Sequence, residues 1–269
     1  NGIAQVFAQK GRHVTLVDTV PAALERALAT IEKSVRKMAE KSGGDAGAAW
    51  ADVKGRLTTA GEIGACAPAD LVVEAIVESR DVKTAIFAEL DRICRPEAIL
   101  ASNTSSISIT VIGAATKRPG QVIGMHFMNP VPIMKLIEII RGQLTSDATT
   151  ATIVGLSEAL GKVPLEANDY PGFVANRILM PMINEACFAL MEGVATREAI
   201  DGVMKLGCAH PMGPLTLADF IGLDICLSIL NVLHTELGDP KYRPCPLLKR
   251  MVAAGLLGKK SGRGFYEYA

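Results

Sequence analysis

His126 and Glu138 are the residues of this sequence whose types and spacing most clearly allow chemistry. His126 ends the apolar run 122–126, and Glu138 interrupts a second apolar run, 134–140. A carboxylate inside an apolar strand is costly unless it is paired. If the two runs are neighbouring strands, the pair would orient the imidazole and stabilise its protonated form for acid–base catalysis. Taken alone, the two residues favour a core histidine bonded to a backbone carbonyl, with Glu138 at a solvated edge.

Two further segments carry polar groups that could hold a substrate. Residues 102–106 (SNTSS) follow an apolar run and would place hydroxyl and amide groups at the carboxyl end of a strand, where open α/β sheets bind ligands. Pro171 and Gly172 predict a turn into a helix, with Asn176 one turn inside it. An Asn amide can both donate to and accept from a carbonyl or hydroxyl. Polarity at the start of a helix would explain Asn176 equally well.

Asp18 is a candidate for binding the ribose of a dinucleotide. It ends a short β-branched strand, 13–18, that follows a helix near the start of the sequence. Helix, strand and acid form the second part of a dinucleotide-binding unit, in which the carboxylate would also repel the 2′-phosphate of NADP. A solvated aspartate is an equally good interpretation. Gly2 is compatible with close approach of a ligand to the backbone.

The first strand and glycine-rich turn of such a unit do not precede residues 1–4 (NGIA) in this sequence. We expect them to belong to the natural protein outside the sequence given. A truncated species with impaired dinucleotide binding is the alternative.

The elements that must position these residues follow from the hydrophobic pattern. Strands are predicted at 13–18, 71–77, 99–104, 122–127 and 134–140, separated by helices. The helix that follows the first of these strands would be capped by Thr19. This alternation indicates βαβ units. After residue 170 only helices are predicted, at 173–191, 196–206, 215–235 and 246–255, before an extended end at 263–268. The predicted fold is α/β: a Rossmann-like, mainly parallel sheet domain (1–170) followed by an all-helical C-terminal domain (171–269).

Composition excludes several classes of function. The 269 residues include 28 basic and 28 acidic side chains, and this balance argues against a nucleic-acid partner. The longest uncharged stretch, 98–116, contains eight Ser, Thr or Asn residues and is a poor membrane span. Six scattered cysteines indicate reduced thiols and no metal site. We expect a cytoplasmic protein, and a mitochondrial-type location stays open because a targeting peptide would precede the sequence given.

Five motifs in register give the sequence a family resemblance. They are residues 102–107 (SNTSSI), 124–138 (GMHFMNPVPIMKLIE), 171–177 (PGFVANR), 205–207 (KLG) and 210–214 (HPMGP). Together they resemble the NAD-dependent (S)-3-hydroxyacyl-CoA dehydrogenases, most of all the short single-function enzymes that act on 3-hydroxybutyryl-CoA. The resemblance covers nearly the whole chain, including its closing residues 260–266 (KSGRGFY).

The resemblance implies a role for each catalytic candidate. His126 would take the proton of the 3-hydroxyl group as hydride leaves C3, and return it in the reverse reaction. Glu138 would hold and electrostatically support His126. Ser105 and Asn176 would hydrogen-bond the substrate oxygen and position the reacting carbon.

The resemblance also implies which residues bind NAD and the acyl-CoA substrate. The implied NAD-binding residues are Gly2, Asp18, Glu78, Lys83, Asn103, Ser105 and Lys260. Ser34 and Lys41 would contact the CoA, although the lysines of that helix could equally form a solvated face.

Alternatives of other classes stay open at this point. One is a dehydrogenase of a related hydroxy acid or of a dicarboxylic 3-hydroxyacyl-CoA. The other is a non-catalytic structural or NAD-binding relative of the same fold. The segment 215–235, apolar on more than one face, indicates a homodimer, or else an ordinary buried helix of the monomer.

Overall fold

A computed structural model of the protein describes residues 1–268. Contacts divide the chain into two compact units, residues 1–169 and the residues from Tyr170 onward. The strands, all in the first unit, are β1 (Val14–Val17), β2 (Leu57–Ala60), β3 (Leu71–Glu74), β4 (Ile99–Ser102), β5 (Val122–Phe127), β6 (Leu136–Arg141) and β7 (Val163–Asn168).

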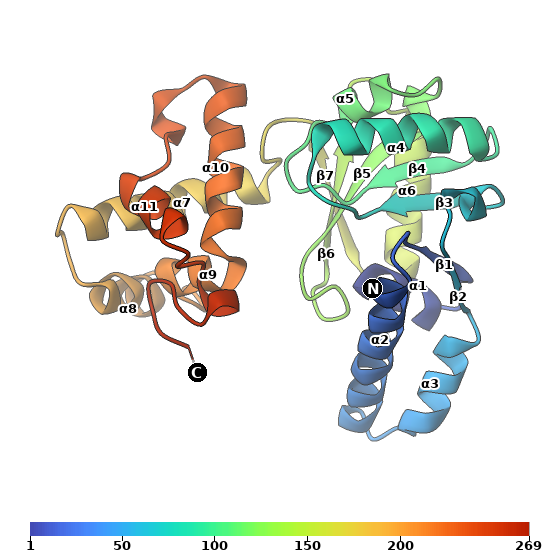
Figure 1. The fold of residues 1–269 in the computed structure, drawn as a ribbon, viewed down its shortest axis with the longest axis horizontal. Helices are drawn as coiled ribbons and strands as arrows, with labels where there is room; N and C mark the ends of the chain where they lie inside the picture. The colour runs from blue at the N-terminus through green and yellow to red at the C-terminus, as the bar shows by residue number, and fades with distance from the viewer. Residues whose placement is uncertain (269) are drawn as a thin grey trace. The chain divides into compact units, whose positions relative to one another are not determined.

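Helices connect the strands and make up the second unit (Figure 1). In the first unit they are α1 (Gly2–Gln9), α2 (Pro21–Lys41), α3 (Ala46–Lys54), α4 (Arg80–Ile93), α5 (Ile109–Ala114) and α6 (Asp147–Ala159). In the second unit they are α7 (Ala175–Met191), α8 (Arg197–Gly207), α9 (Pro214–Ile221), α10 (Leu223–Leu237) and α11 (Pro246–Ala253). Short 3₁₀ helices lie at η1 (Ile63–Cys66), η2 (Pro119–Gln121), η3 (Pro240–Tyr242) and η4 (Lys259–Ser261).

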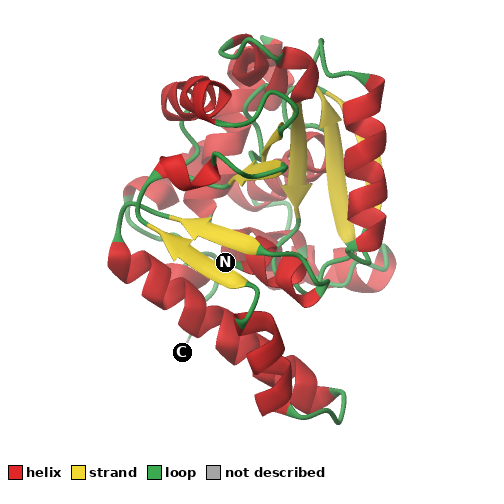
Figure 2. Cartoon of the chain, turned by 90° about the vertical axis from the view of Figure 1, so that its right-hand side faces the viewer, coloured by secondary structure: helices red, strands yellow, loops and turns green. Residues whose placement is uncertain are grey.

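The strands, yellow in Figure 2, fall into two sheets. β1 pairs with β2 in parallel, and the larger sheet has the order β3-β4-β5-β6-β7. In the larger sheet only the β5–β6 ladder is antiparallel. The mainly parallel pairing and the helical second unit confirm the predicted fold class.

The larger sheet is covered by helices on both faces. Val6 of α1 and Ile153 of α6 pack on one face, against Ile123, Met125 and Ile139. Because side chains alternate along a strand, Gly124 and His126 point to the opposite face. There a Cβ on Gly124 would lie 2.8 Å from Cβ of Ile140 and 3.1 Å from the Ile109 side chain of α5. Glycine at 124 therefore lets β5, β6 and α5 approach closely.

The α2–α3 pair forms a smaller core with the two-stranded sheet. Figure 1 shows the two helices side by side, and Ile31, Val35, Trp50 and Val53 bury their side chains between them and α1. The start of α2 differs from the prediction that Thr19 caps it. Val20 occupies the N-cap position without a side-chain cap, and its N–H donates to the Asp18 carboxylate instead.

The second unit has its own core. The prediction of one long helix over residues 215–235 of this unit is wrong. The segment 215–235 is two helices, α9 and α10, which meet at 98°. The bend lies at Gly222, whose φ of +106° is accessible to glycine and strained for other residues. Most apolar residues of the segment are buried within this unit, among them Leu215, Ala218, Leu223, Leu230 and Leu233.

The predicted extended end, 263–268, forms only isolated bridges, at Arg263. It is held mainly by Asp219 of α9, whose carboxylate accepts the N–H groups of Phe265 and Tyr266 and the hydroxyl of Tyr268. Among residues 1–268 no single helix has the length and apolar composition to cross a membrane. Only the bent pair α9 and α10 together meets that test.

Candidate active site

His126 and Glu138 lie directly opposite each other on β5 and β6, as the neighbouring-strand prediction required. The distance from Nδ1 of His126 to Oε2 of Glu138 is 2.7 Å. Both residues are more than nine-tenths buried, with 7% and 4% of their surfaces exposed. All six residues of β5 are buried, so a polar group on this strand needs a partner from the adjacent strand. The structure thus favours the paired interpretation over a histidine bonded to a backbone carbonyl.

Ser105 lies in the loop that follows β4, as predicted, and this loop is tied to the strand that carries His126. The side-chain oxygen of Asn103 accepts the N–H of Phe127, the residue after His126, at 2.9 Å. The backbone N–H of Asn103 donates to the carbonyl of Glu74 at the end of β3. Asn103 therefore fixes the segment between β4 and α5 against two strands at once.

Glu78 accepts several hydrogen bonds from the loop that carries Ser105. One carboxylate oxygen accepts the N–H of Ser105 at 2.9 Å, the N–H of Ser106 at 3.2 Å and the hydroxyl of Thr104. The other lies 3.3 Å from the ammonium of Lys83. Glu78 and Lys83, both predicted to line the cofactor site, therefore contact each other beside Ser105, the candidate catalytic serine.

Glu74 completes this cluster, and the sequence reasoning missed it. Lys83 is only 1% exposed, and its ammonium lies 2.6 Å from the Glu74 carboxylate. The sequence does contain a signal for Glu74: it interrupts the apolar run 71–77, just as Glu138 interrupts the apolar run 134–140. β3 ends at Glu74, earlier than predicted, where its carboxylate turns back along the chain to accept the N–H of Ile76.

Asp18 follows β1 directly, at the carboxyl end of the strand, and is exposed. One of its carboxylate oxygens accepts the Val20 N–H at 2.8 Å, which orients the group. An exposed, oriented carboxylate at the end of a parallel strand fits the ribose of a dinucleotide. Packing alone favours glycine at position 2, because a Cβ there would lie 3.0 Å from Cβ of Val131.

The CoA candidates Ser34 and Lys41 lie seven residues apart on α2, which places them on the same side of that helix. Ser34 is half-buried and Lys41 is exposed at the last residue of the helix. No described contact joins either residue to the His126–Glu138 pair.

The remaining candidates belong to the second unit. Asn176 is the second residue of α7 and 8% exposed. It lies nearer the helix start than predicted, because Gly172 and Phe173 take positive φ angles of 76° and 48° and form the turn. Lys260 of η4 forms an ion pair of 2.6 Å with Asp224 of α10.

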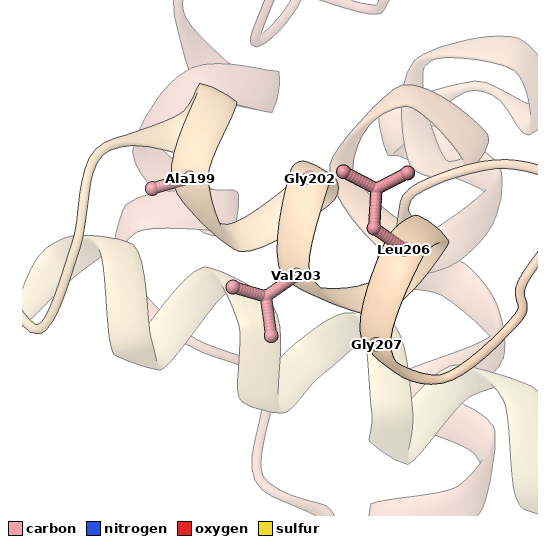
Figure 3. Close-up of a pocket in the computed structure, with 5 residues that line it drawn as sticks. All are labelled: Ala199, Gly202, Val203, Leu206 and Gly207. Atoms are coloured by element: carbon pink, nitrogen blue, oxygen red, sulfur yellow. The ribbon is translucent and has the colours of Figure 1, made fainter.

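A metal site and a surface hollow are two other places where chemistry could occur, and neither offers it among the described residues. Among residues 1–268 no group of three or more His, Cys, Asp or Glu side chains is arranged to hold a metal ion. A shallow hollow on α8 is lined by Ala199, Gly202, Val203, Leu206 and Gly207 (Figure 3). These side chains are apolar or absent, so the hollow offers no acid, base or nucleophile.

Two family models match the chain in succession. The NAD-binding domain of 3-hydroxyacyl-CoA dehydrogenase matches residues 1–170, and the C-terminal domain of the same family matches residues 172–268. The chain belongs to the 3-hydroxyacyl-CoA dehydrogenase family. It is accordingly an NAD-dependent oxidoreductase, and the non-catalytic alternative is set aside.

Similar members of the 3-hydroxyacyl-CoA dehydrogenase family agree with this assignment. A probable 3-hydroxybutyryl-CoA dehydrogenase of Deinococcus radiodurans is 58% identical over 99% of this chain and 95% of its own length. The mitochondrial hydroxyacyl-coenzyme A dehydrogenase of Homo sapiens is 43% identical over 99% of this chain and 87% of its own. The crystal structure of (S)-3-hydroxybutyryl-CoA dehydrogenase from Ralstonia eutropha superposes with a TM-score of 0.95 at 49% identity, over 100% of this chain and 94% of that one.

Proposed function

We propose that this member of the 3-hydroxyacyl-CoA dehydrogenase family acts on a short-chain substrate, reversibly oxidising (S)-3-hydroxybutyryl-CoA to acetoacetyl-CoA. The observation that carries the proposal is the buried His126–Glu138 pair on adjacent strands. Similarity to relatives named for 3-hydroxybutyryl-CoA supports the chain length. Because the more similar of these relatives are bacterial, we also propose a cytoplasmic location.

In this proposal the protein's own residues handle the proton. Glu138 accepts a hydrogen bond from Nδ1 of His126, which fixes the ring and leaves Nε2 as the nitrogen that exchanges a proton with substrate. During oxidation the 3-hydroxyl proton passes to His126, and the C3–H bond breaks with its electron pair leaving as hydride. Glu138 stabilises the positive imidazolium that results. In the reverse direction His126 returns the proton to the carbonyl oxygen.

Other candidates bind and orient the reactants. Ser105 and Asn176 would hydrogen-bond the substrate oxygen, and Ser34 and Lys41 would contact the CoA. Bound NAD would supply the hydride acceptor. Asp18 would hold its ribose, and the remaining NAD-binding candidates, Gly2, Glu78, Lys83, Asn103 and Lys260, would line its site together with Ser105.

The test of this function is NADH consumption with acetoacetyl-CoA, run on the protein and on His126→Ala. Loss of a general acid–base group should lower kcat by about 10²- to 10⁴-fold with the fold retained. His13→Ala removes an exposed histidine of the same unit and is the matched control. Equal rates in all three proteins would remove His126 from the mechanism. A higher kcat/KM with a long-chain 3-ketoacyl-CoA than with acetoacetyl-CoA would overturn the proposed chain length.

We also propose that the protein is a homodimer joined through its helical unit. The buried side chains of α9 and α10 do not require a partner, but several exposed apolar side chains remain in this unit. Val203 and Leu206 of α8 are 64% and 90% exposed, and Phe220 of α9 is 54% exposed. A partner subunit would remove this apolar surface from water.

A further inference from the structure

Glu74 is a buried charge that the proposed mechanism does not use. It is 5% exposed, and its side chain contacts three different parts of the first unit. One carboxylate oxygen lies 2.6 Å from the Lys83 ammonium of α4 and also accepts the N–H of Ile76. The other accepts the hydroxyl of Ser102, the last residue of β4, at 2.7 Å. A carboxylate buried this deeply persists only if such partners compensate its lost hydration.

Lys83 connects Glu74 to Glu78, because its ammonium forms an ion pair with each carboxylate. Its ammonium is fully buried between the two carboxylates, 2.6 Å from Glu74 and 3.3 Å from Glu78. Glu78 is half-exposed and lies at the other end of this row of charges, where it accepts the N–H groups of Ser105 and Ser106. A continuous set of charge-assisted contacts therefore runs from β3 to the backbone of Ser105.

A second, shorter path leads from Glu74 to the same loop. The Ser102 hydroxyl that donates to Glu74 also accepts the N–H of Thr104 at 3.2 Å. The carbonyl of Glu74 accepts the N–H of Asn103 at 2.8 Å. Segment 102–106 is thus attached to Glu74 at its start, through Ser102 and Asn103, and at its end, through Lys83 and Glu78.

We propose that Glu74 is a positioning residue for catalysis, which holds segment 102–106, and with it Ser105, through Lys83 and Glu78. The catalytic part rests on the proposed function, in which Ser105 hydrogen-bonds the substrate oxygen. The structural part does not, because it concerns only how the segment is held.

The charge of Glu74, and not only its shape, is required. With Glu74 ionised, the buried ammonium is shared by two carboxylates, and Glu78 keeps an oxygen for the N–H groups of Ser105 and Ser106. With a neutral group at position 74, the Lys83 charge has Glu78 as its one remaining acidic partner among its described ion pairs. The ammonium then draws the Glu78 carboxylate away from the loop, because an unpaired buried charge is more costly than lost hydrogen bonds to backbone N–H groups at a partly exposed carboxylate.

Hydrogen exchange tests the structural part without any need for activity. In Glu74→Gln, which keeps the size of the side chain, the amides of Ser105 and Ser106 should exchange about tenfold to a hundredfold faster, as expected for loss of a charge-assisted hydrogen bond. Amides of β5 and β6 should keep their protection. Unchanged exchange at both serines would overturn the proposal.

Asp91→Asn is the matched control, because Asp91 and Arg118 form another largely buried ion pair of the same unit, with side chains 10% and 12% exposed. It should change neither kcat nor exchange at Ser105. If Glu74→Gln does not fold, Glu78→Gln cuts the same path at its half-exposed end and should give the same faster exchange. Full protection in that variant would equally overturn the proposal.

A double-mutant cycle tests the catalytic part. Misplacement of a positioning group by about 1 Å costs up to about 10²-fold, so Glu74→Gln should lower kcat with acetoacetyl-CoA by about tenfold to a hundredfold. In a Ser105→Ala background the same substitution should have little further effect, because the two residues act through one group. An equal fold-loss in both backgrounds would show that Glu74 does not act through Ser105. If Ser105→Ala itself keeps full kcat, the role proposed for Ser105 fails, whereas the exchange data still decide whether Glu74 holds the segment.

Discussion

In the proposed mechanism Glu138 fixes which nitrogen of His126 faces the substrate and stabilises the imidazolium by its charge. Glu138→Gln keeps the size of the side chain and removes the charge. We expect kcat to fall by at least about tenfold, and by no more than the 10²- to 10⁴-fold loss of His126→Ala. KM should change little, since Glu138 bonds His126 and has no proposed contact with the substrate.

Steady-state kinetics with acetoacetyl-CoA measure the effect of Glu138→Gln. Glu166→Gln, an exposed glutamate on the adjacent strand β7, is the control. A kcat for Glu138→Gln that equals the control's would contradict the supporting role.

Asp18 should determine the choice between NADH and NADPH. Its carboxylate would accept ribose hydroxyls and repel a 2′-phosphate. Asp18→Ala should therefore raise the Kd for NADH by about tenfold to a hundredfold and reduce the preference over NADPH. Fluorescence titration with each nucleotide measures both quantities. Glu97→Ala removes an exposed acid that precedes β4, at the amino end of that strand, and should leave both Kd values unchanged. An unaltered NADH affinity in Asp18→Ala would remove Asp18 from the nucleotide site.

A partner for Glu138 could be expected because a charge inside an apolar strand needs one, but the residues alone favoured a histidine bonded to a backbone carbonyl. The family resemblance implied the pair, and the structure shows it on adjacent strands. The same argument applies to Glu74, but its partner could not be found in this way. Lys83 lies on a helix, and the loop held by Glu78 comes 26 to 28 residues later in the chain. Which helix and which loop return to the end of a given strand is determined by tertiary packing and leaves no periodic signal in the sequence.

Among the secondary structure elements, α4 ends in a largely buried ion pair whose contribution depends on pH. The Arg118 guanidinium bonds the Asp91 carboxylate at 2.6 Å and also donates to the carbonyls of Asp91 and Cys94 at the end of the helix. Burial raises the pKa of Asp91, but the Lys117 N–H and the Arg118 guanidinium outweigh it, so the pKa lies below its ordinary value. The ionised form is therefore favoured by folding.

It follows that Asp91→Asn should destabilise the protein by about 1–3 kcal/mol at pH 7. The lowered pKa gives the native state a contribution that is complete above the ordinary aspartate pKa of about 3.9 and is lost as pH falls through the native value. The difference in unfolding free energy between the two proteins should thus shrink below about pH 4. Urea denaturation from pH 7 downward measures it. A difference that is constant with pH would refute the electrostatic origin.

Elements with a clear hydrophobic period were predicted well, and the omissions have physical reasons. β2 has four residues, of which the middle two are exposed threonines, so it shows no pattern without its partner β1. α6 contains three threonines and a glycine, which are poor helix formers, and it is stabilised by packing on the sheet. The bend at Gly222 was missed because apolar residues continue across it on both sides.

For the whole molecule, light scattering after size-exclusion chromatography should give twice the mass of the chain at micromolar concentration. Leu206→Glu, which places a charge on the exposed face of α8, should shift the protein toward monomer because burying an unpaired charge is costly. Leu144→Glu is the control, since Leu144 is 64% exposed in the first unit. A monomeric wild-type protein would reject the dimer. A fully dimeric Leu206→Glu would exclude α8 from the interface.

The β5–β6 pairing places His126 and Glu138, the pair proposed to handle the proton, twelve residues apart in one antiparallel hairpin. The residues proposed to recognise NAD and the substrate lie on elements from α1 to η4. The His126–Glu138 pair thus occupies one short contiguous block of the sequence. The recognition surfaces can then diverge loop by loop, through single substitutions or insertions, without separating the acid–base pair. Such a division lets evolution change what the scaffold accepts while the chemistry it performs stays constant.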